Sequence, residues 1–194
     1  MNKDLLKTAG LPKASFSTWR GPKRVSEKAE KWLAKTHQDI LQRRSGYHLL
    51  LLGPSISGKT FLCSAMLNCL RKKGHSFRYH RIPLYLESIF THYREGSKLV
   101  EEGLRPHILV LEDLGREATS GYPHTRKYIS LMLTERKCGM VLTSRKDLNS
   151  LSDIYGPSLM TDIKNRCIII RCPMIPALRE AREENKTKWL ESES

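Results

Sequence analysis

The chain has 194 residues, 28% of them charged, and a formal net charge of +14 at pH 7. This length allows one α/β core with short extensions and excludes two full domains. No apolar stretch reaches membrane-spanning length and the start lacks a secretory signal, so we expect a cytoplasmic protein with no membrane partner. The excess of Lys and Arg indicates a polyanionic partner such as nucleic acid, although a solubilising surface would also account for it.

The amino-terminal part carries half of this charge: residues 1–48 contain eleven Lys or Arg and four acidic residues. The five cysteines are odd in number and lie mostly in apolar surroundings, so we expect buried thiols and no disulfide framework. The histidines show no metal-ligand spacing. The only metal we expect is a Mg²⁺ ion bound together with a nucleotide.

In chain order, the pattern predicts a basic lead-in segment (1–45), a core (46–175) and a charged C-terminal helix and tail (176–194). The predicted strands of the core are 47–52, 77–81, 108–112, 140–143 and 167–171. The predicted helices are 25–43 in the lead-in segment, 59–73, 83–98, 124–137, 148–154 and 157–164 in the core, and 177–190 at the end. Alternating strands and helices indicate an α/β fold, a parallel five-stranded sheet covered by helices on both faces.

A phosphate-binding loop follows the first predicted strand. Its sequence has the G-x-x-x-x-G-K-[ST] spacing between a strand and a helix, and its residues are Gly53, Pro54, Ser55, Ile56, Ser57, Gly58, Lys59 and Thr60. The two glycines allow a tight turn whose N–H groups point at phosphate oxygens, a position that the following helix dipole also favours. We expect Lys59 to reach the β- and γ-phosphates of ATP, Thr60 to bind Mg²⁺, and the next residue, Phe61, to belong to the nucleotide site.

Two adjacent acids end the third predicted strand. Four apolar residues, 108–111, precede Glu112 and Asp113. Acids at the carboxyl end of a buried strand can face a nucleotide across the sheet. One acid can hold the magnesium ion and the other can deprotonate the attacking water.

Residues 140–145 comprise the fourth predicted strand and the two residues after it, and residues 9–19 lie ahead of the core. Together with these segments, the motifs resemble the DnaC/IstB-like branch of AAA+ ATPases, which includes replicative helicase loaders and transposition helper ATPases. The resemblance implies an ASCE-type P-loop NTPase fold with Mg-ATP as cofactor. It assigns the metal-linked acid to Glu112 and the catalytic acid to Asp113. It further implies a water-positioning role for Thr143 or Ser144, an arginine finger at Arg166, and a nucleotide contact at Arg179.

Three positions depart from the family pattern. The order Glu112-Asp113 replaces the commoner Asp-Asp or Asp-Glu, Arg145 follows Ser144 where the family usually has Asn, and Asp162 stands where the finger arginine is expected. These departures permit slow hydrolysis.

Four functions are therefore compared. The leading one is a DNA-binding ATPase, preferring single strands, that loads or regulates a replicative helicase and can assemble into homo-oligomers. The alternative is a transposition helper that delivers a transposase. A nucleotide-gated binding protein with little hydrolysis and a small P-loop kinase complete the set. The stretch 115–121 offers only one arginine, fewer than the arginine-rich lid of such kinases.

Overall fold

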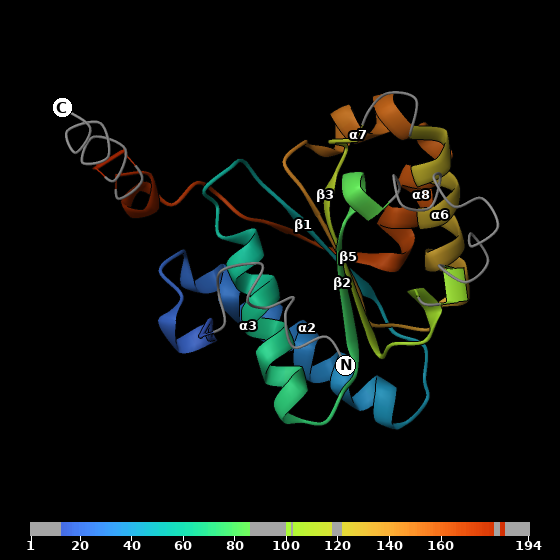
Figure 1. The fold of residues 1–194 in the computed structure, drawn as a ribbon, viewed down its shortest axis with the longest axis horizontal. Coiled ribbons are helices and arrows are strands. Elements are labelled where there is room, and N and C mark those ends of the chain that lie inside the picture. Colours follow the sequence, from blue (N-terminus) through green and yellow to red (C-terminus); the bar gives the residue numbers. More distant parts are fainter. Residues whose placement is uncertain (1–12, 86–99, 102, 118–121, 181–182, 185–194) are drawn as a thin grey trace.

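The computed structural model describes residues 13–85, 100–101, 103–117, 122–180 and 183–184, and it centres on a five-stranded sheet with helices on both faces (Figure 1). The strands are β1 (His48–Leu52), β2 (Phe77–Arg81), β3 (Ile108–Leu114), β4 (Met140–Ser144) and β5 (Cys167–Arg171). The helices are η1 (Phe16–Thr18), α2 (Lys23–Leu41), α3 (Lys59–Lys72), α6 (Tyr122–Glu135), α7 (Leu148–Tyr155) and α8 (Pro157–Arg166). The predicted helices 83–98 and 177–190 lie mostly outside the described residues.

All strand pairs are parallel, and the strand order is β2-β3-β4-β1-β5. β1 and β3, which precede the phosphate loop and the acid pair, are therefore separated by β4 alone. Because parallel strands point the same way, the ends of these three strands meet at one edge of the sheet. The predicted fold class is confirmed.

The run of leucines in β1 explains why this strand lies in the interior of the sheet, between β4 and β5, since every residue of the strand is buried. Successive side chains of a strand point to opposite faces. Leu49 and Leu51 pack in the cluster with α2 and α3, whereas Leu50 and Leu52 pack in the cluster with α6, α7 and α8. Figure 1 shows these two helical layers on either side of the sheet.

The lead-in helix α2 packs on the core through one apolar face. Ala29, Trp32 and Leu33 are buried beside α3, as the predicted amphipathic pattern requires. The indole of Trp32 also donates a hydrogen bond of 2.8 Å to the carbonyl of Tyr47, just before β1. This contact ties the lead-in helix to the strand that carries the phosphate loop.

Three predicted strand boundaries were wrong: β1 begins one residue later than predicted and β4 ends one residue later, and the largest difference concerns β3. β3 was expected to end at Glu112, but it continues to Leu114. The register explains the extension: Leu111 pairs with Leu142 and Leu114 pairs with Ser144, so β3 has one more residue than β4 in this interval. The extra residue is a β-bulge, which a strand pattern read from the sequence does not reveal.

All five cysteines are free thiols, as expected, and all except the half-buried Cys69 are buried. Within the described part of the chain, none of the helices combines the length and apolarity that crossing a membrane requires.

Candidate nucleotide-binding site

The phosphate loop leaves the carboxyl end of β1 and leads directly into α3. The Gly53 N–H donates to the carbonyl of Ser144 on β4, at 3.1 Å, which fixes the start of the loop. Ile56 and Gly58 both have left-handed backbone conformations, with φ of 63° and 75°. These turns bend the loop back so that α3 begins at Lys59, and the amino end of a helix favours anionic phosphate.

Gly53 is required by close packing. A Cβ atom at this position would lie 2.0 Å from the carbonyl oxygen of Cys172, which follows β5. The Cys172 N–H also donates to the carbonyl of Leu52, the last residue of β1, at 2.6 Å. The residue that follows β5 therefore contacts both the end of β1 and the phosphate loop. No side chain fits there without moving the loop.

The Lys59 side chain lies over its own loop. Its ammonium donates to the carbonyls of Gly53 and Pro54 at 2.6 and 2.8 Å and to the Ser57 hydroxyl at 3.0 Å. Burial lowers the pKa of Lys59, and the nearby Arg145 lowers it further, while the two carboxylates at 112 and 113 raise it. Lys59 therefore lies within the electrostatic reach of the acid pair.

The bulge in β3 brings both acids to the same site. Neighbouring residues of a regular strand point to opposite faces, so Glu112 and Asp113 could not both face the loop without a local change. Asp113 has a φ of 64°, a left-handed conformation that Asp tolerates better than most residues. The bulge and this conformation redirect Asp113.

Glu112 is buried, with 3% of its surface exposed. One of its oxygens accepts a hydrogen bond from the Tyr79 hydroxyl. Burial raises the pKa of the Glu112 carboxyl, and hydrogen bonding from Tyr79 and the nearby Thr60 hydroxyl opposes part of that rise. Among the described residues, none makes a hydrogen bond of normal geometry to its other oxygen, Oε1.

These atoms fit a magnesium ion. Mg²⁺ takes oxygen ligands, usually one or two from the protein together with substrate phosphates and water. The buried Oε1 atom of Glu112 and the nearby hydroxyl of Thr60 would supply such ligands if the ion bound here.

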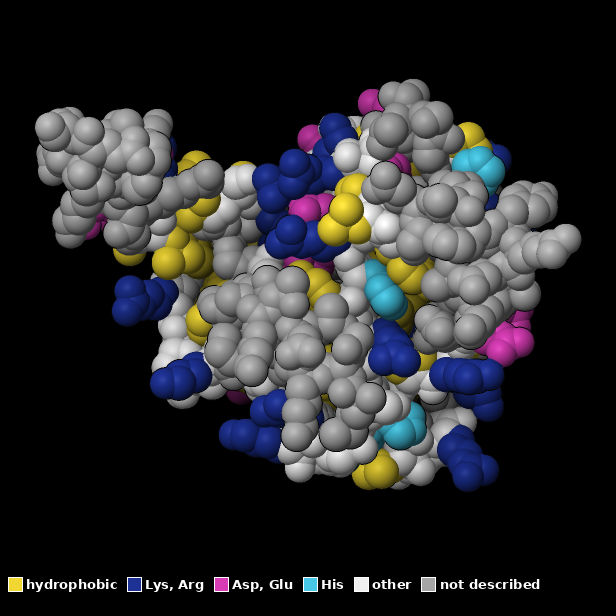
Figure 2. Space-filling view, in the orientation of Figure 1, with side chains coloured by type: hydrophobic (Ala, Val, Ile, Leu, Met, Phe, Trp, Pro, Cys, Tyr) yellow, Lys and Arg dark blue, Asp and Glu magenta, His cyan; other side chains and the backbone are white. Residues whose placement is uncertain are grey.

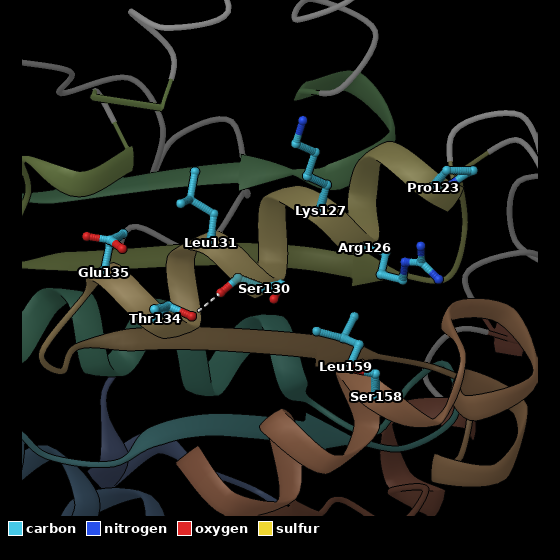
Figure 3. Close-up of a pocket in the computed structure, with 9 residues that line it drawn as sticks. All are labelled: Pro123, Arg126, Lys127, Ser130, Leu131, Thr134, Glu135, Ser158 and Leu159. Carbon is cyan, nitrogen blue, oxygen red and sulfur yellow. Dashed lines mark hydrogen bonds between the residues drawn. The ribbon is translucent and has the colours of Figure 1, made fainter.

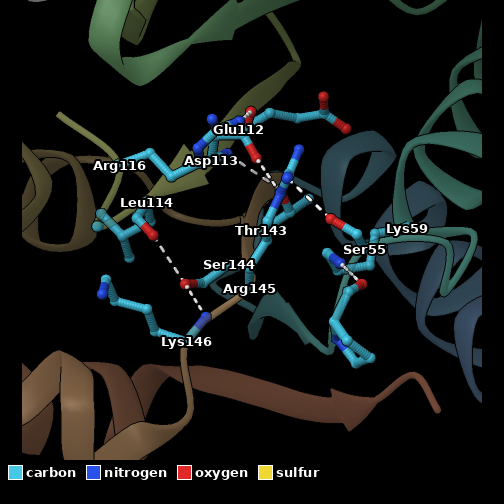
Figure 4. Close-up of polar contacts among 12 residues, drawn as sticks. Ser55, Lys59, Glu112, Asp113, Leu114, Arg116, Thr143, Ser144, Arg145 and Lys146 are labelled. Atoms are coloured by element: carbon cyan, nitrogen blue, oxygen red, sulfur yellow. Dashed lines mark hydrogen bonds and ion pairs between the residues drawn. The ribbon is translucent and has the colours of Figure 1, made fainter. Parts of the chain in front are cut away.

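Asp113 is held by β4 (Figure 4). Its N–H donates to the Thr143 hydroxyl at 3.2 Å, so Thr143 contacts the backbone of the acid pair. The Ser144 hydroxyl instead donates to the Leu114 carbonyl at 2.7 Å and accepts from the Lys146 N–H at 3.1 Å. Ser144 therefore links the end of β3, after the bulge, to the segment that follows β4.

The Asp113 carboxylate is flanked by two guanidinium groups. Arg145 Nε lies 3.3 Å from one carboxylate oxygen, and Arg116 lies 3.4 Å from the other. Arg145 also donates to the Ser55 hydroxyl of the phosphate loop at 2.8 Å. Arg145 thus bridges the loop and the acid, a role that the sequence analysis did not assign because it noted this position only as a departure from the family pattern.

An apolar pocket of about 560 Å³ lies beside the loop. Trp19, Phe61, Ile175 and Leu178 line it, with the ring centroids of Trp19 and Phe61 6.0 Å apart. The Trp19 ring lies against Gly58. Its position and its aromatic walls suit a nucleotide base, and only Phe61 was predicted, because the other walls come from segments on either side of the core.

Neither of the two predicted arginines, Arg166 and Arg179, is among the residues that line this pocket. Arg166 ends α8 immediately before β5, at the amino ends of the strands, where it donates to the Leu133 carbonyl at 3.3 Å. It is therefore at the edge of the sheet opposite the phosphate loop of its own chain. Arg179 is exposed and follows Leu178, one of the pocket residues.

A second cavity, of about 660 Å³, lies between α6 and α8 (Figure 3). Arg126, Lys127 and Leu131 are among its exposed lining residues. It contains no residue of the phosphate loop or the acid pair. A different region of the surface holds both signs of charge: on the face shown in Figure 2, acidic side chains lie among Lys and Arg side chains. This region corresponds to the carboxyl ends of the strands in Figure 1.

The parallel sheet, the phosphate loop after β1 and the acid pair after β3 define a P-loop nucleotide-binding protein of the AAA+ type. The sequence model of the family described as IstB-like ATP binding protein matches residues 34–187. The chain belongs to this family, the DnaC/IstB-like AAA+ branch that its motifs resemble.

Three solved structures illustrate the fold. The DnaC helicase loader is 20% identical, with a TM-score of 0.66, over 82% of this chain and 96% of that one. A DNA replication initiation factor is 18% identical, with a TM-score of 0.66, over 91% and 55% of the two chains. AMPPCP-bound DnaA from Aquifex aeolicus is 18% identical, with a TM-score of 0.63, over 83% and 50%.

The chain thus spans about half the length of the initiation factor and of DnaA. At these identities the likeness concerns the fold. No curated protein sequence matches the chain.

Proposed function

We propose that the protein is a cytoplasmic Mg-ATP-dependent ATPase that binds DNA, preferring single strands, and loads or regulates a replicative helicase. The observation that carries the ATPase part is the convergence of Lys59, Glu112 and Asp113 at the carboxyl ends of β1 and β3. The β-bulge brings two neighbouring carboxylates to one site and leaves a buried Glu112 oxygen without a normal hydrogen bond, which is an arrangement that a bound ligand would explain.

In this proposal the loop amides and Lys59 bind the β- and γ-phosphates. Thr60 and Glu112 hold Mg²⁺, which neutralises phosphate charge when bound. Asp113 accepts a proton from a water molecule as the water oxygen bonds to the γ-phosphorus. The bond between that phosphorus and the bridging oxygen breaks, leaving ADP and inorganic phosphate. Thr143 keeps the base in place through its contact with the Asp113 N–H.

Two substitutions test the ATPase assignment. Lys59→Ala removes the cation of the loop and should abolish binding of AMPPCP. Asp113→Asn is nearly isosteric but removes the base, so phosphate release should fall about 100-fold or more while AMPPCP still binds.

Other results would contradict the assignment. Equally slow phosphate release by the wild type and Asp113→Asn would favour a nucleotide-gated binding protein. A phosphorylated small-molecule product would favour a kinase.

The DNA part of the proposal is supported by charge. A groove of about 400 Å³ between α2, the segment that precedes β1, and β5 is lined by Lys28 and Lys31, with the exposed ring of Tyr47 beside them. Lysines beside an aromatic ring can contact phosphates and stack on an unpaired base.

Assembly of several copies gives a role to Arg166. Because it lies at the edge of the sheet opposite its own phosphate loop, we propose that it could act as an arginine finger only toward the nucleotide of another copy.

The identity of the protein partner distinguishes the two candidate functions, helicase loading and transposase delivery. The name of the DnaC structure supports a replicative helicase, whereas the family match to IstB-like proteins supports a transposase as the second candidate. Tagged wild-type protein, incubated with AMPPCP and lysate of its own source, should retain a helicase that Lys59→Ala does not retain. Recovery of a transposase in its place would establish the second candidate.

A further inference from the structure

A third acidic side chain, Glu117, lies in the turn that follows β3 and is buried, with 7% of its surface exposed. One of its carboxylate oxygens accepts a hydrogen bond from the Gly115 N–H at 3.1 Å. The other accepts a hydrogen bond from the hydroxyl of Tyr155, the last residue of α7. The side chain therefore joins its own turn to a helix that follows β4 in the chain.

The surroundings of this carboxylate are apolar. Tyr155 packs in the hydrophobic cluster that also contains Leu114 and Leu151. Both groups that donate to Glu117 are neutral, so the carboxylate loses hydration without gaining a cation from them. A residue that adds such a cost to an apolar layer is more often explained by function than by packing.

The turn that Glu117 closes begins at Asp113. The Arg116 N–H donates to the Asp113 carbonyl at 3.1 Å, and the Glu117 side chain bends back to Gly115 within the same turn. Asp113 has a left-handed backbone conformation, which costs free energy in a residue other than glycine and persists only where its surroundings hold it. The anchor on α7 supplies such support from outside the strand.

We propose that Glu117 is a positioning residue for Asp113: it anchors the turn after β3 to α7, so that the Asp113 carboxylate keeps its direction. This inference rests on the proposed ATPase function and adds to it a residue that binds no phosphate and transfers no proton. Loss of the anchor should therefore lower kcat and leave nucleotide binding unchanged.

The test measures kcat and KM for ATP hydrolysis, and AMPPCP affinity by titration calorimetry. Tyr155→Phe removes one of the two hydrogen bonds and keeps the ring, so kcat should fall about 3- to 10-fold while KM and AMPPCP affinity stay within about twofold. Glu117→Ala removes both hydrogen bonds. Its kcat should fall about 10- to 100-fold, the range expected when a catalytic group is displaced by up to about 1 Å.

Two further variants serve as controls. The amide of Glu117→Gln can accept from the Gly115 N–H and donate to the Tyr155 oxygen, so its kcat should stay within about threefold of the wild type. Tyr128→Phe is the matched control for Tyr155→Phe. Tyr128 is buried in the same helical layer, where its hydroxyl lies 3.1 Å from that of Tyr85. Its replacement should leave kcat unchanged.

A background that lacks the base separates positioning from general structural support. In Asp113→Asn the direction of the side chain no longer matters for proton transfer, so adding Glu117→Ala should change the residual rate of phosphate release by less than about twofold. A merely structural role would lower the residual rate as much as it lowers the rate of the wild type.

The inference is overturned if Tyr155→Phe and Glu117→Ala leave kcat unchanged, if they weaken AMPPCP binding as much as they lower kcat, or if Tyr128→Phe lowers kcat equally. Tyr155→Phe decides the question alone if Glu117→Ala does not fold. In each of these cases AMPPCP binding that depends on Lys59, with turnover that depends on Asp113, would still uphold the proposed function. Failure of the wild type to hydrolyse ATP would overturn both.

Discussion

One additional residue in β3 determines the chemistry of the site. With Asp113 in a left-handed conformation, the strand places a buried carboxylate at 112 and a more accessible one at 113 on the same side. The buried oxygen suits a metal ion and the accessible carboxylate suits proton transfer. The sequence predicted a site at these two adjacent acids, but it did not reveal the bulge that changes the direction of Asp113.

A buried histidine at the start of β1 makes stability depend on pH. His48 accepts a hydrogen bond from the Met140 N–H at 3.3 Å, and burial together with Arg136 lowers its pKa from 6.5 to about 4. Because the unfolded chain binds the proton more tightly, stability falls as pH drops from 6.5 towards 4. His48 should account for a loss of about 2 kcal/mol between pH 7 and pH 5.

Urea unfolding at both pH values checks this prediction. The His48→Gln variant should lose about 2 kcal/mol less than the wild type between pH 7 and pH 5. His80, whose pKa burial also lowers to about 4, is present in both proteins and cancels in the comparison. Equal losses in the two proteins would contradict the assignment to His48.

At the scale of elements, the site exists because β4 lies between β1 and β3. Thr143 reaches the acid loop, and the Ser144 carbonyl receives the first N–H of the phosphate loop. The loop therefore depends on strands that are distant in sequence, including β5 through the Cys172 carbonyl.

This dependence predicts unequal effects of two glycine substitutions. Gly53→Ala would place a Cβ atom against the Cys172 carbonyl and should lower the free energy of unfolding by about 3 kcal/mol or more. Gly74→Ala, at a left-handed turn with open space around it, should cost only about 1 kcal/mol. Chemical denaturation of both variants measures the difference, and similar costs would refute the proposed role of the Cys172 contact.

At the scale of the whole molecule, the chain carries a net charge of +14. Long-range attraction to a polyanion follows from such a charge, but the surface that binds is set by where the lysines lie. The groove between α2, the segment that precedes β1, and β5 offers lysines beside an aromatic ring, while the cavity between α6 and α8 offers Arg126 and Lys127 of α6 (Figure 3).

Single-stranded DNA binding should therefore weaken steeply with salt. With about five phosphate contacts, affinity should fall roughly 100-fold between 50 and 200 mM salt. Replacing Lys28 and Lys31 together by Gln should reduce both affinity and salt dependence, as fluorescence anisotropy would show. The control Arg126→Gln/Lys127→Gln removes the same charge, and an equal effect from it would exclude the groove as the specific surface.

The sequence by itself determined which described segments of the core form strands and helices, and where the phosphate-loop motif and the adjacent acids fall along them, because periodicity and short motifs are local properties. Only the tertiary structure decided that Thr143 and Arg145 meet Asp113, that Trp19 and Ile175 form one pocket, and that Arg166 lies at the far edge of the sheet. These relations depend on strand order and on a register shift of one residue. Both are set by packing between segments far apart in the chain, which no local pattern encodes.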